Sequence, residues 1–286
     1  MEHTHNDRTL VYTPESPITH PIQLLESMNR DLRSSFPLAY RLTIRDVSGM
    51  YRQTALGYFW AIFPPLLTSL TFIILNRAKV FGLGHYSIPY PVFIITGTVF
   101  WQLFVDALNS PLKVLNANRP MLSKISFPKE ALILSAIGQV LFSFVIKLLL
   151  LGFVLILFGT PVKWTVTLLI LPIMGLLSIG ILLGLLLVPL GVLYHDVQYG
   201  LAVCTASLMF FTPVVFESPQ GGLVARIIAI NPLSPLVQGC REMLFYPELH
   251  QLKAILIVLS VTLVLILAAW ILYRIALPVL IERMEA

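Results

Sequence analysis

The segment 41–67 constrains the fold of this chain more than any other stretch. It reads RLTIRDVSGMYRQTALGYFWAIFPPLL and runs directly into an uncharged segment that extends over 53–76. About 20 apolar residues suffice to cross a bilayer, and Lys and Arg accumulate in the cytoplasmic headgroup region. The segment therefore predicts an interface helix that leads from the cytoplasmic surface into a first membrane span. Its charged residues are Arg41, Arg45, Asp46 and Arg52.

The composition indicates that most of the chain lies in a membrane. Of its 286 residues, 57% are hydrophobic and 12% are charged, whereas a soluble domain carries about 25% charged residues. The net charge of +5 does not indicate nucleic-acid binding, because the basic residues lie at the ends of apolar segments. Cys204 and Cys240 have no metal-site or redox spacing, and buried free thiols are favoured over a disulfide. We expect an all-α polytopic membrane protein without a metal site.

The uncharged runs predict six membrane spans. A semi-apolar region over 217–250 separates the last two spans and is interrupted by prolines and glycines. Two helices fit there, at about 221–230 and 233–245, and both are too short to cross a bilayer. We expect them to be re-entrant or interfacial. The six spans are expected at about 54–75, 90–110, 131–158, 165–190, 198–216 and 252–273.

The distribution of Lys and Arg predicts the orientation. Twelve of the 19 lie in the N-terminal segment, the 111–130 loop and the C-terminal tail, which places both termini in the cytoplasm. The opposite side still carries six, namely Arg77, Lys79, Lys163, Arg226, Arg241 and Lys253. We expect a disordered stretch over 1–20, a short helix over 21–33 and a second helix over 38–47. The expected divisions are a cytoplasmic tail (1–36), an amphipathic interface helix (37–53), a transmembrane domain (54–274) and a second tail (275–286).

The loop 111–130, PLKVLNANRPMLSKISFPKE, is predicted to contain a short helix over 120–127 that Pro128 ends. Apolar side chains on this helix, surrounded by charged ones, suit docking into a groove of another protein. A loop that binds lipid headgroups and sets the topology remains the alternative. The apolar residues are Met121, Leu122, Ile125 and Phe127, and the charged ones are Arg119, Lys124, Lys129 and Glu130.

The patterns RQTALGYFWAIFPPLL and LSKISFPKEALIL resemble the permease subunits of ABC transporters that export bacterial cell-surface polysaccharides. The resemblance runs from about residue 40 to the end, and the family exports O antigen, capsule and teichoic acid. It implies that the 111–130 loop forms a coupling helix on an ATPase, and that an N-terminal interface helix over about 38–52 also touches it. The implied coupling residues are Arg119, Pro120, Met121, Lys124, Phe127, Pro128, Lys129 and Glu130.

One position departs from the family. After the fourth span the family commonly has an Arg–Asp or similar pair, and this chain has His195 and Asp196. We expect Asp196 to keep its role at a helix end, whereas contacts that require a permanent Arg charge are in question.

The sequence also implies partners. No Gly is followed by Lys, so the chain has no phosphate-binding loop of the G-x-x-x-x-G-K-[ST] type, and it has no expected catalytic residue or cofactor. The resemblance implies a separate ATPase in two copies that binds ATP and Mg, a second copy of this chain and a lipid-linked polysaccharide substrate. Membrane lipid is a further partner, and nucleic acid is not. The expected location is the bacterial inner membrane.

Aromatic side chains are candidates for the substrate path, because they stack on sugar rings without a fixed hydrogen-bond pattern. Interface anchors and lipid-facing surface remain the alternative. The short helices over 217–250 are the expected outward gate, with Asn231, Pro232, Pro235 and Arg241 as candidate residues. The path candidates are Tyr58, Phe59, Trp60, Phe63, Phe100, Trp101 and Phe104.

Two further features lie within the spans. Lys147 is expected to snorkel or to pair with Asp106 or a backbone carbonyl, and the alternative is attraction for a lipid-linked diphosphate or anionic sugars. Gly180 and Gly184 form a G-x-x-x-G step that is consistent with close helix packing.

Three other functions compete with polysaccharide export. An ABC exporter of a small amphiphile, lipid or drug would share the architecture. An ion-driven transporter would favour several intramembrane carboxylates, and Asp106 is the only candidate. A membrane glycosyltransferase would require clustered carboxylates or a His site, and the sequence shows neither.

Overall fold

The computed structural model describes residues 21–52, 54–78, 87–122, 128–218 and 221–285. Within these residues the chain is helical and contains no β-strand, which confirms the all-α prediction. The predictions for 1–20 and for Lys124, Ile125 and Phe127 lie outside the described residues.

The first helix, α1 (Pro21–Arg52), runs for 32 residues without interruption. The prediction of two separate short helices is therefore wrong. Pro37 lies inside α1, where a proline removes one backbone hydrogen bond and usually breaks a helix. It is exposed, so water can reach the carbonyl group that loses its donor. Ala39 and Leu42, which follow Pro37, belong to the same hydrophobic core as α5, so the second half of α1 is packed against the spans.

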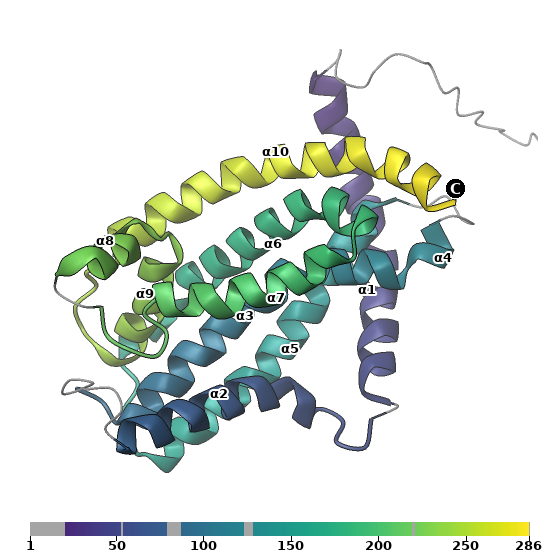
Figure 1. Cartoon of the computed structure of the whole chain (residues 1–286). Helices are drawn as coiled ribbons and strands as arrows, with labels where there is room; N and C mark the ends of the chain where they lie inside the picture. Colours follow the sequence, from purple (N-terminus) through teal and green to yellow (C-terminus); the bar gives the residue numbers. More distant parts are fainter. Residues whose placement is uncertain (1–20, 53, 79–86, 123–127, 219–220, 286) are drawn as a thin grey trace, which may run out of the picture.

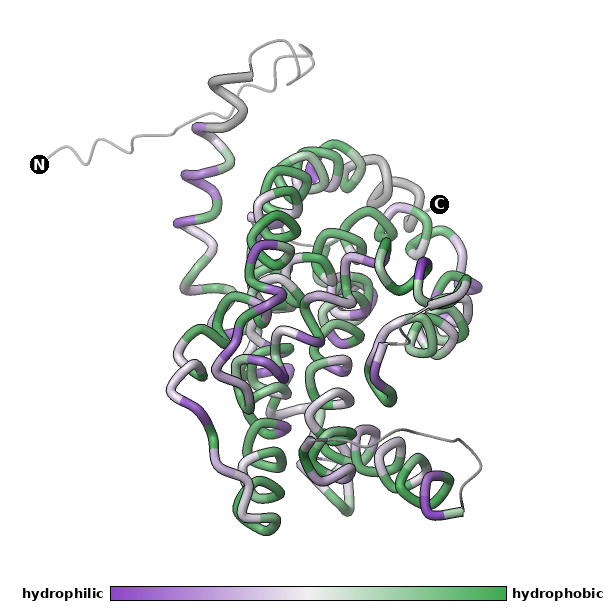
Figure 2. The backbone as a smooth tube through the Cα atoms, turned by 90° about the vertical axis from the view of Figure 1, so that its left-hand side faces the viewer, coloured by the Kyte–Doolittle hydropathy of each residue, from purple (hydrophilic) through white to green (hydrophobic). Residues whose placement is uncertain are grey.

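Five helical segments are long and apolar enough to cross a membrane. They correspond to the first four predicted spans and to the last one. In Figure 2 these helices are mostly hydrophobic along their length, and hydrophilic residues are frequent in α1. The five are α2 (Phe59–Arg77), α3 (Tyr90–Ala117), α5 (Glu130–Leu157), the 3-10 turn η2 (Trp164–Leu169) with α6 (Ile170–Leu193), and α10 (Leu252–Glu285).

The fifth predicted span, 198–216, is not one continuous helix. The helix α7 (Asp196–Leu208) and the 3-10 turn η3 (Met209–Phe211) end five residues early. Residues 212–215 are buried non-helical backbone that continues toward α9. Irregular backbone is tolerated at membrane depth where protein covers it. The number of helical spans is therefore five, or six if the next helix pair counts as one.

The two short helices predicted before the last span are present. They are α8 (Gly222–Ile230) and α9 (Leu233–Phe245), and they meet at an angle of 86°. Asn231 and Pro232 form the break between them, as predicted, whereas Ser234 and Pro235, also expected to mark it, lie inside the first turn of α9.

The centre of the subunit is the contact between α3 and α6. A Cβ atom on Gly180 would lie 2.9 Å from the Phe104 carbonyl oxygen, and one on Gly184 would lie 2.6 Å from the Leu108 carbonyl oxygen. Both separations are shorter than an ordinary van der Waals contact, so only glycine permits this approach. The prediction of close packing at the G-x-x-x-G step is confirmed.

The helices define two ends of the subunit (Figure 1). At one end Arg274 of α10 forms ion pairs with Asp31 of α1 and Glu130 of α5, and α4 (Arg119–Leu122) lies at this end. At the other end α8 and α9 pack near the start of α3 and η2. We refer to them as the loop end and the gate end.

Candidate functional site

The helix α4 is the described part of the predicted coupling loop. The Arg119 guanidinium donates to the Asn116 side-chain oxygen at 3.0 Å and to the Val192 carbonyl oxygen at 2.8 Å. These bonds tie α4 to the last turn of α6. Pro120 is exposed, Met121 is half-buried and Leu122 is buried. The outward surface of this helix therefore comprises Pro120 and the exposed part of Met121, which also packs against the hydrophobic core.

The residues after the loop are less exposed than the sequence suggests. Pro128 is half-buried, and Glu130 is only 4% exposed because Arg274 donates to it at 3.3 Å. Lys129 is half-buried, and burial lowers the pKa of its ammonium although the Glu130 carboxylate opposes this shift. Glu130 thus does not belong to an exposed charged rim but joins the start of α5 to the end of α10.

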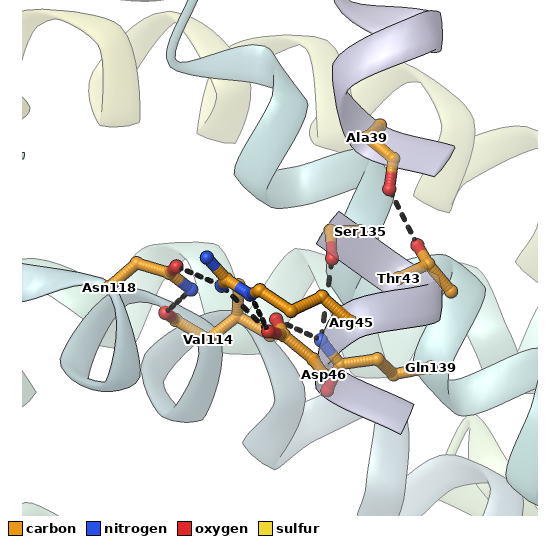
Figure 3. A network of polar contacts seen from close by, with 8 residues as sticks. All are labelled: Ala39, Thr43, Arg45, Asp46, Val114, Asn118, Ser135 and Gln139. Atoms are coloured by element: carbon orange, nitrogen blue, oxygen red, sulfur yellow. Dashed lines mark hydrogen bonds and ion pairs between the residues drawn. The ribbon is translucent and has the colours of Figure 1, made fainter. Parts of the chain in front are cut away.

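A polar network attaches the predicted interface helix to the loop end (Figure 3). Arg45 forms an ion pair with Asp46 at 2.6 Å and donates to the Asn118 side-chain oxygen at 2.5 Å. The other Asp46 oxygen accepts from Gln139 at 3.0 Å. Asn118 caps α3 one residue before α4. The network therefore links α1 to the end of α3 that leads into the loop. Arg41 and Arg52 are exposed on α1.

The turn between α6 and α7 lies beside Arg119. A cavity of about 330 Å³ is lined by Asn116, Arg119, His195, Gln198 and Tyr199. Asp196 is the first residue of α7, which confirms its predicted position at a helix end, where a carboxylate stabilises the helix dipole. The sequence did not indicate that the loop and the His195–Asp196 turn meet, because no local pattern links residues so far apart.

The aromatic residues at the start of α2 are accessible. Tyr58 is 54% exposed and Trp60 is 49% exposed, while Phe59 is also exposed and Phe63 is half-buried. The Phe63 ring lies 5.7 Å from the Phe59 ring and 5.4 Å from the Trp60 ring. These four side chains form an aromatic surface at the entry to the first span.

The aromatic residues of α3 are placed differently. Phe100 and Phe104 are fully buried in the subunit core, so neither faces a path in this structure. Trp101 lines a cavity of about 210 Å³ between α2, α3 and α7, together with Gln102 and threonine side chains from all three helices. A cavity that combines an aromatic ring and other apolar side chains with a few polar groups is a candidate binding surface for a sugar, which has apolar ring faces and hydroxyl groups.

The predicted gate residues hold the bent pair in place. The Asn231 side chain donates to the Phe211 carbonyl at 2.9 Å and accepts from the Leu233 amide at 3.0 Å. Arg241 is 5% exposed and donates to the carbonyl groups of Pro213 and Val214. Arg241 is therefore a buried anchoring residue and not an exposed loop charge. Burial thus accounts for one of the six basic residues that the sequence placed on the side opposite to the cytoplasm. Pro232 is exposed and Pro235 is half-buried.

The ion pair between Lys147 and Asp106 confirms one of the expected partners of this lysine. Lys147 is 2% exposed. Gln102 and Ser143 also donate to the Asp106 carboxylate, at 3.2 and 3.3 Å. The carboxylate compensates the buried ammonium, so Lys147 does not present a free positive charge.

Both cysteines are free thiols, as predicted, but only Cys240 is buried and Cys204 is exposed. In the part of the chain that the structure describes, no group of three His, Cys, Asp or Glu residues could hold a metal ion.

Together the apolar helices, the buried ion pair and the bent helix pair define a polytopic α-helical membrane protein. The chain is similar to three curated proteins, from two organisms, that share one name. It is 25% identical over 244 residues to the O-antigen export system permease protein RfbA of Myxococcus xanthus, covering 84% of this chain and 92% of that protein. Two proteins of the same name from Klebsiella pneumoniae are 23% identical over 222 residues, or 76% of this chain and 83% of theirs. No family model matches the chain. The predicted resemblance to permease subunits of polysaccharide exporters is thus confirmed.

Proposed function

We propose that this chain is the membrane-spanning subunit of an ATP-driven exporter that moves lipid-linked cell-surface polysaccharide, of the O-antigen type, across the bacterial inner membrane. The observation that carries the proposal is the similarity to O-antigen export permeases over most of both chains. A partner ATPase, which binds ATP and Mg in two copies, supplies the energy. Two copies of this chain enclose the path. Capsule is a second possible cargo of the same machinery.

The loop end is the proposed contact with the ATPase. Its outward surface comprises Pro120 and Met121 on α4 and the exposed arginines of α1. The bonds of Arg119 to α6 and of Arg45 to the end of α3 support this assignment, because they connect the loop end to two central helices. Force applied to α4 therefore reaches α3 and α6 through hydrogen bonds rather than through a free loop.

The proposed path follows the face formed by α2, α3 and α7. The aromatic surface of α2 stands at its entry, and the cavity beside Trp101 lies further along it. Sugar rings stack on aromatic faces and hydrogen-bond to threonine hydroxyls and to Gln102. The bent pair α8–α9 is the proposed outward gate. The residues retained for the path are Tyr58, Phe59, Trp60, Phe63 and Trp101.

The test separates transport from coupling. Cells depleted of this protein are expected to accumulate lipid-linked polysaccharide inside and to lose it from the surface, and the intact gene restores export. Met121→Glu is expected to abolish restoration and to weaken co-purification of the ATPase by about tenfold or more, since a carboxylate replaces an apolar contact at the centre of an interface. Val162→Glu is the matched control, because Val162 is an exposed apolar residue at the gate end.

The outcome that contradicts the proposal is an unchanged distribution of polysaccharide in depleted cells that have no redundant exporter. An ABC exporter of a small amphiphile, lipid or drug would then be the better assignment. Normal export by Met121→Glu with full ATPase binding would remove the coupling role of α4 but not the export function.

A further inference from the structure

A cavity lined by both polar and apolar side chains lies between the interface helix and the spans and has no role in the functions described above. It has a volume of about 150 Å³ and lies between Val47 and Met50 of α1, Asp106 to Lys113 of α3, and Gln139 to Ser143 of α5. A single water molecule requires about 10–15 Å³ of such space, so the cavity has room for a small polar group. Its polar side chains are Asp106, Asn109, Ser110, Lys113, Gln139 and Ser143.

Gln139, Asn109 and Ser110 each donate to other parts of the protein, so their side-chain oxygens can accept from a ligand. The Gln139 amide nitrogen donates hydrogen bonds to Asp46 and to Ser135, so the side-chain oxygen of Gln139 points away from these two residues. Asn109 donates to the Val105 carbonyl at 2.8 Å, and Ser110 donates to the Ala136 carbonyl at 2.9 Å. Acceptor oxygens therefore remain for a ligand, beside the second Asn109 amide hydrogen and the Lys113 ammonium.

The Asp106 carboxylate adds a further acceptor. Its side chain is 25% exposed although Lys147, Gln102 and Ser143 donate to it. A carboxylate offers about four acceptor positions, so one remains for a ligand. Since Lys147 balances the charge of Asp106, this inner part of the cavity is neutral. A neutral group with hydroxyl donors therefore suits it better than a cation or an anion.

Lys113 provides the only exposed charge on the cavity wall among the described residues. It lies two turns after Asp106 on α3 and close to the end that leads to α4. An ammonium at this position pairs with a phosphate group. A ligand that places a phosphodiester at Lys113 and a hydroxyl-bearing group beside Asp106, Asn109 and Gln139 would satisfy both parts of the cavity and leave no net charge.

We propose that this cavity binds the head group of an anionic glycerophospholipid, phosphatidylglycerol, with the phosphate on Lys113 and the glycerol hydroxyls on the acceptor oxygens. The acyl chains follow the exposed apolar surface of α5, at Val145, Leu149 and Phe153. The lipid then contacts α1, α3 and α5 at once and links the interface helix to the spans. The site requires neither the ATPase nor the polysaccharide, so it is independent of the proposed function.

Native mass spectrometry of the purified full chain in detergent tests the site with three lipids of identical acyl chains. Phosphatidylglycerol is the probe, phosphatidylethanol has the same charge without the hydroxyls, and phosphatidylcholine is zwitterionic. Phosphatidylglycerol is expected to bind about tenfold more tightly than phosphatidylethanol, because two or three hydrogen bonds distinguish them. Phosphatidylcholine is expected to bind most weakly.

Two variants assign the two parts of the ligand. Asn109→Leu is expected to abolish the preference for phosphatidylglycerol over phosphatidylethanol, and Lys113→Gln is expected to weaken both anionic lipids by about tenfold. Lys163→Gln, which removes an exposed lysine at the gate end, is the control. Equal binding of phosphatidylglycerol and phosphatidylethanol, or an undiminished preference in folded Asn109→Leu protein, would overturn the proposal. If Lys163→Gln weakened the binding of the anionic lipids equally, the binding would depend on general surface charge and not on this cavity. That result would also overturn the proposal.

Discussion

The guanidinium carbon of Arg241 lies 3.7 Å from the centre of the Phe93 ring. The same side chain donates to the Pro213 and Val214 carbonyls and, at 3.4 Å, to the Phe93 carbonyl. One buried side chain of α9 therefore joins the gate helices to the first turn of α3 and to the non-helical backbone after η3. Arginine suits this position because its planar fork serves several acceptors while it stacks on an aromatic face.

Arg241→Met is expected to destabilise the subunit by about 1–3 kcal/mol for each carbonyl that loses its donor. Arg241→Lys should be intermediate, because an ammonium keeps the charge but cannot reach acceptors on three sides. Thermal unfolding of the purified protein in detergent measures the order. Equal stability of Arg241→Met and the original protein would contradict the anchoring role.

Gly97 permits this arrangement, because a Cβ atom there would collide with the Arg241 guanidinium and the Val214 carbonyl oxygen. Gly97→Ala is expected to displace Arg241 and to lower the unfolding temperature by several degrees. Gly152→Ala on α5 is the matched control, since a Cβ atom there meets no atom within 4 Å. Similar unfolding temperatures for the two variants would show that Gly97 is not needed for this contact.

The span positions could be predicted because each is a long apolar run with at most one charge, and the bent pair could be predicted because prolines and glycines divide the region 217–250 into two helices that are each too short to cross. The interruption of the fifth span at Phe211 could not, because its cause is tertiary. Asn231 and Arg241 supply hydrogen bonds to carbonyl groups in the non-helical stretch, and they lie 20 or more residues away in the sequence.

The candidate site was less predictable than the fold. A sequence shows that Glu130 is charged, but not that Arg274 and the packing of α10 bury it. Likewise, the aromatic residues of α2 and α3 have similar composition, and only the contact of α3 with α6 places Phe104 in the core. Lys147 is the opposite case. A lone buried lysine requires compensation, so Asp106 could be predicted as one partner, beside snorkelling or a backbone carbonyl, and the structure selects Asp106.

We expect the loss of one partner of the Lys147–Asp106 ion pair to destabilise the subunit more than the loss of both. Asp106→Asn leaves the 2% exposed ammonium without its carboxylate, and we expect a loss of about 3–5 kcal/mol. The double variant Asp106→Leu with Lys147→Met removes both charges and should recover most of that stability. Chemical denaturation in detergent gives the comparison. A double variant as unstable as Asp106→Asn would mean that the site needs these charges for a reason other than mutual compensation.

The cluster around Arg274 predicts a similar cycle at the loop end. Arg274→Gln leaves Glu130, whose side chain is 5% exposed, without its cation, and the expected loss is about 3–5 kcal/mol. Glu130→Gln in the same chain should restore part of this loss, because the neutral amide no longer requires a cation. Asp31→Asn should have a smaller effect, since the Asp31 side chain is 35% exposed and water screens its charge. Additive effects of Arg274→Gln and Glu130→Gln would contradict direct coupling.

The orientation and the number of crossings are tested together by single cysteines in Cys204→Ser protein, labelled with an impermeant maleimide in right-side-out and inverted membrane vesicles. Glu26, Lys163 and Glu217 are exposed, and each is replaced by Cys in turn. Glu26→Cys is expected to react only in inverted vesicles, and Lys163→Cys only in right-side-out vesicles, because three spans separate them. We expect Glu217→Cys to be labelled in the same vesicles as Lys163→Cys. The reason is that α7, η3 and the buried backbone after them together lead from the loop end to the gate end. If Glu217→Cys reacted only in inverted vesicles, α7 would return to the side from which it started and would not count as a membrane crossing. Reaction of Glu26→Cys from the outside would instead reverse the whole assignment and place the loop end away from any cytoplasmic ATPase.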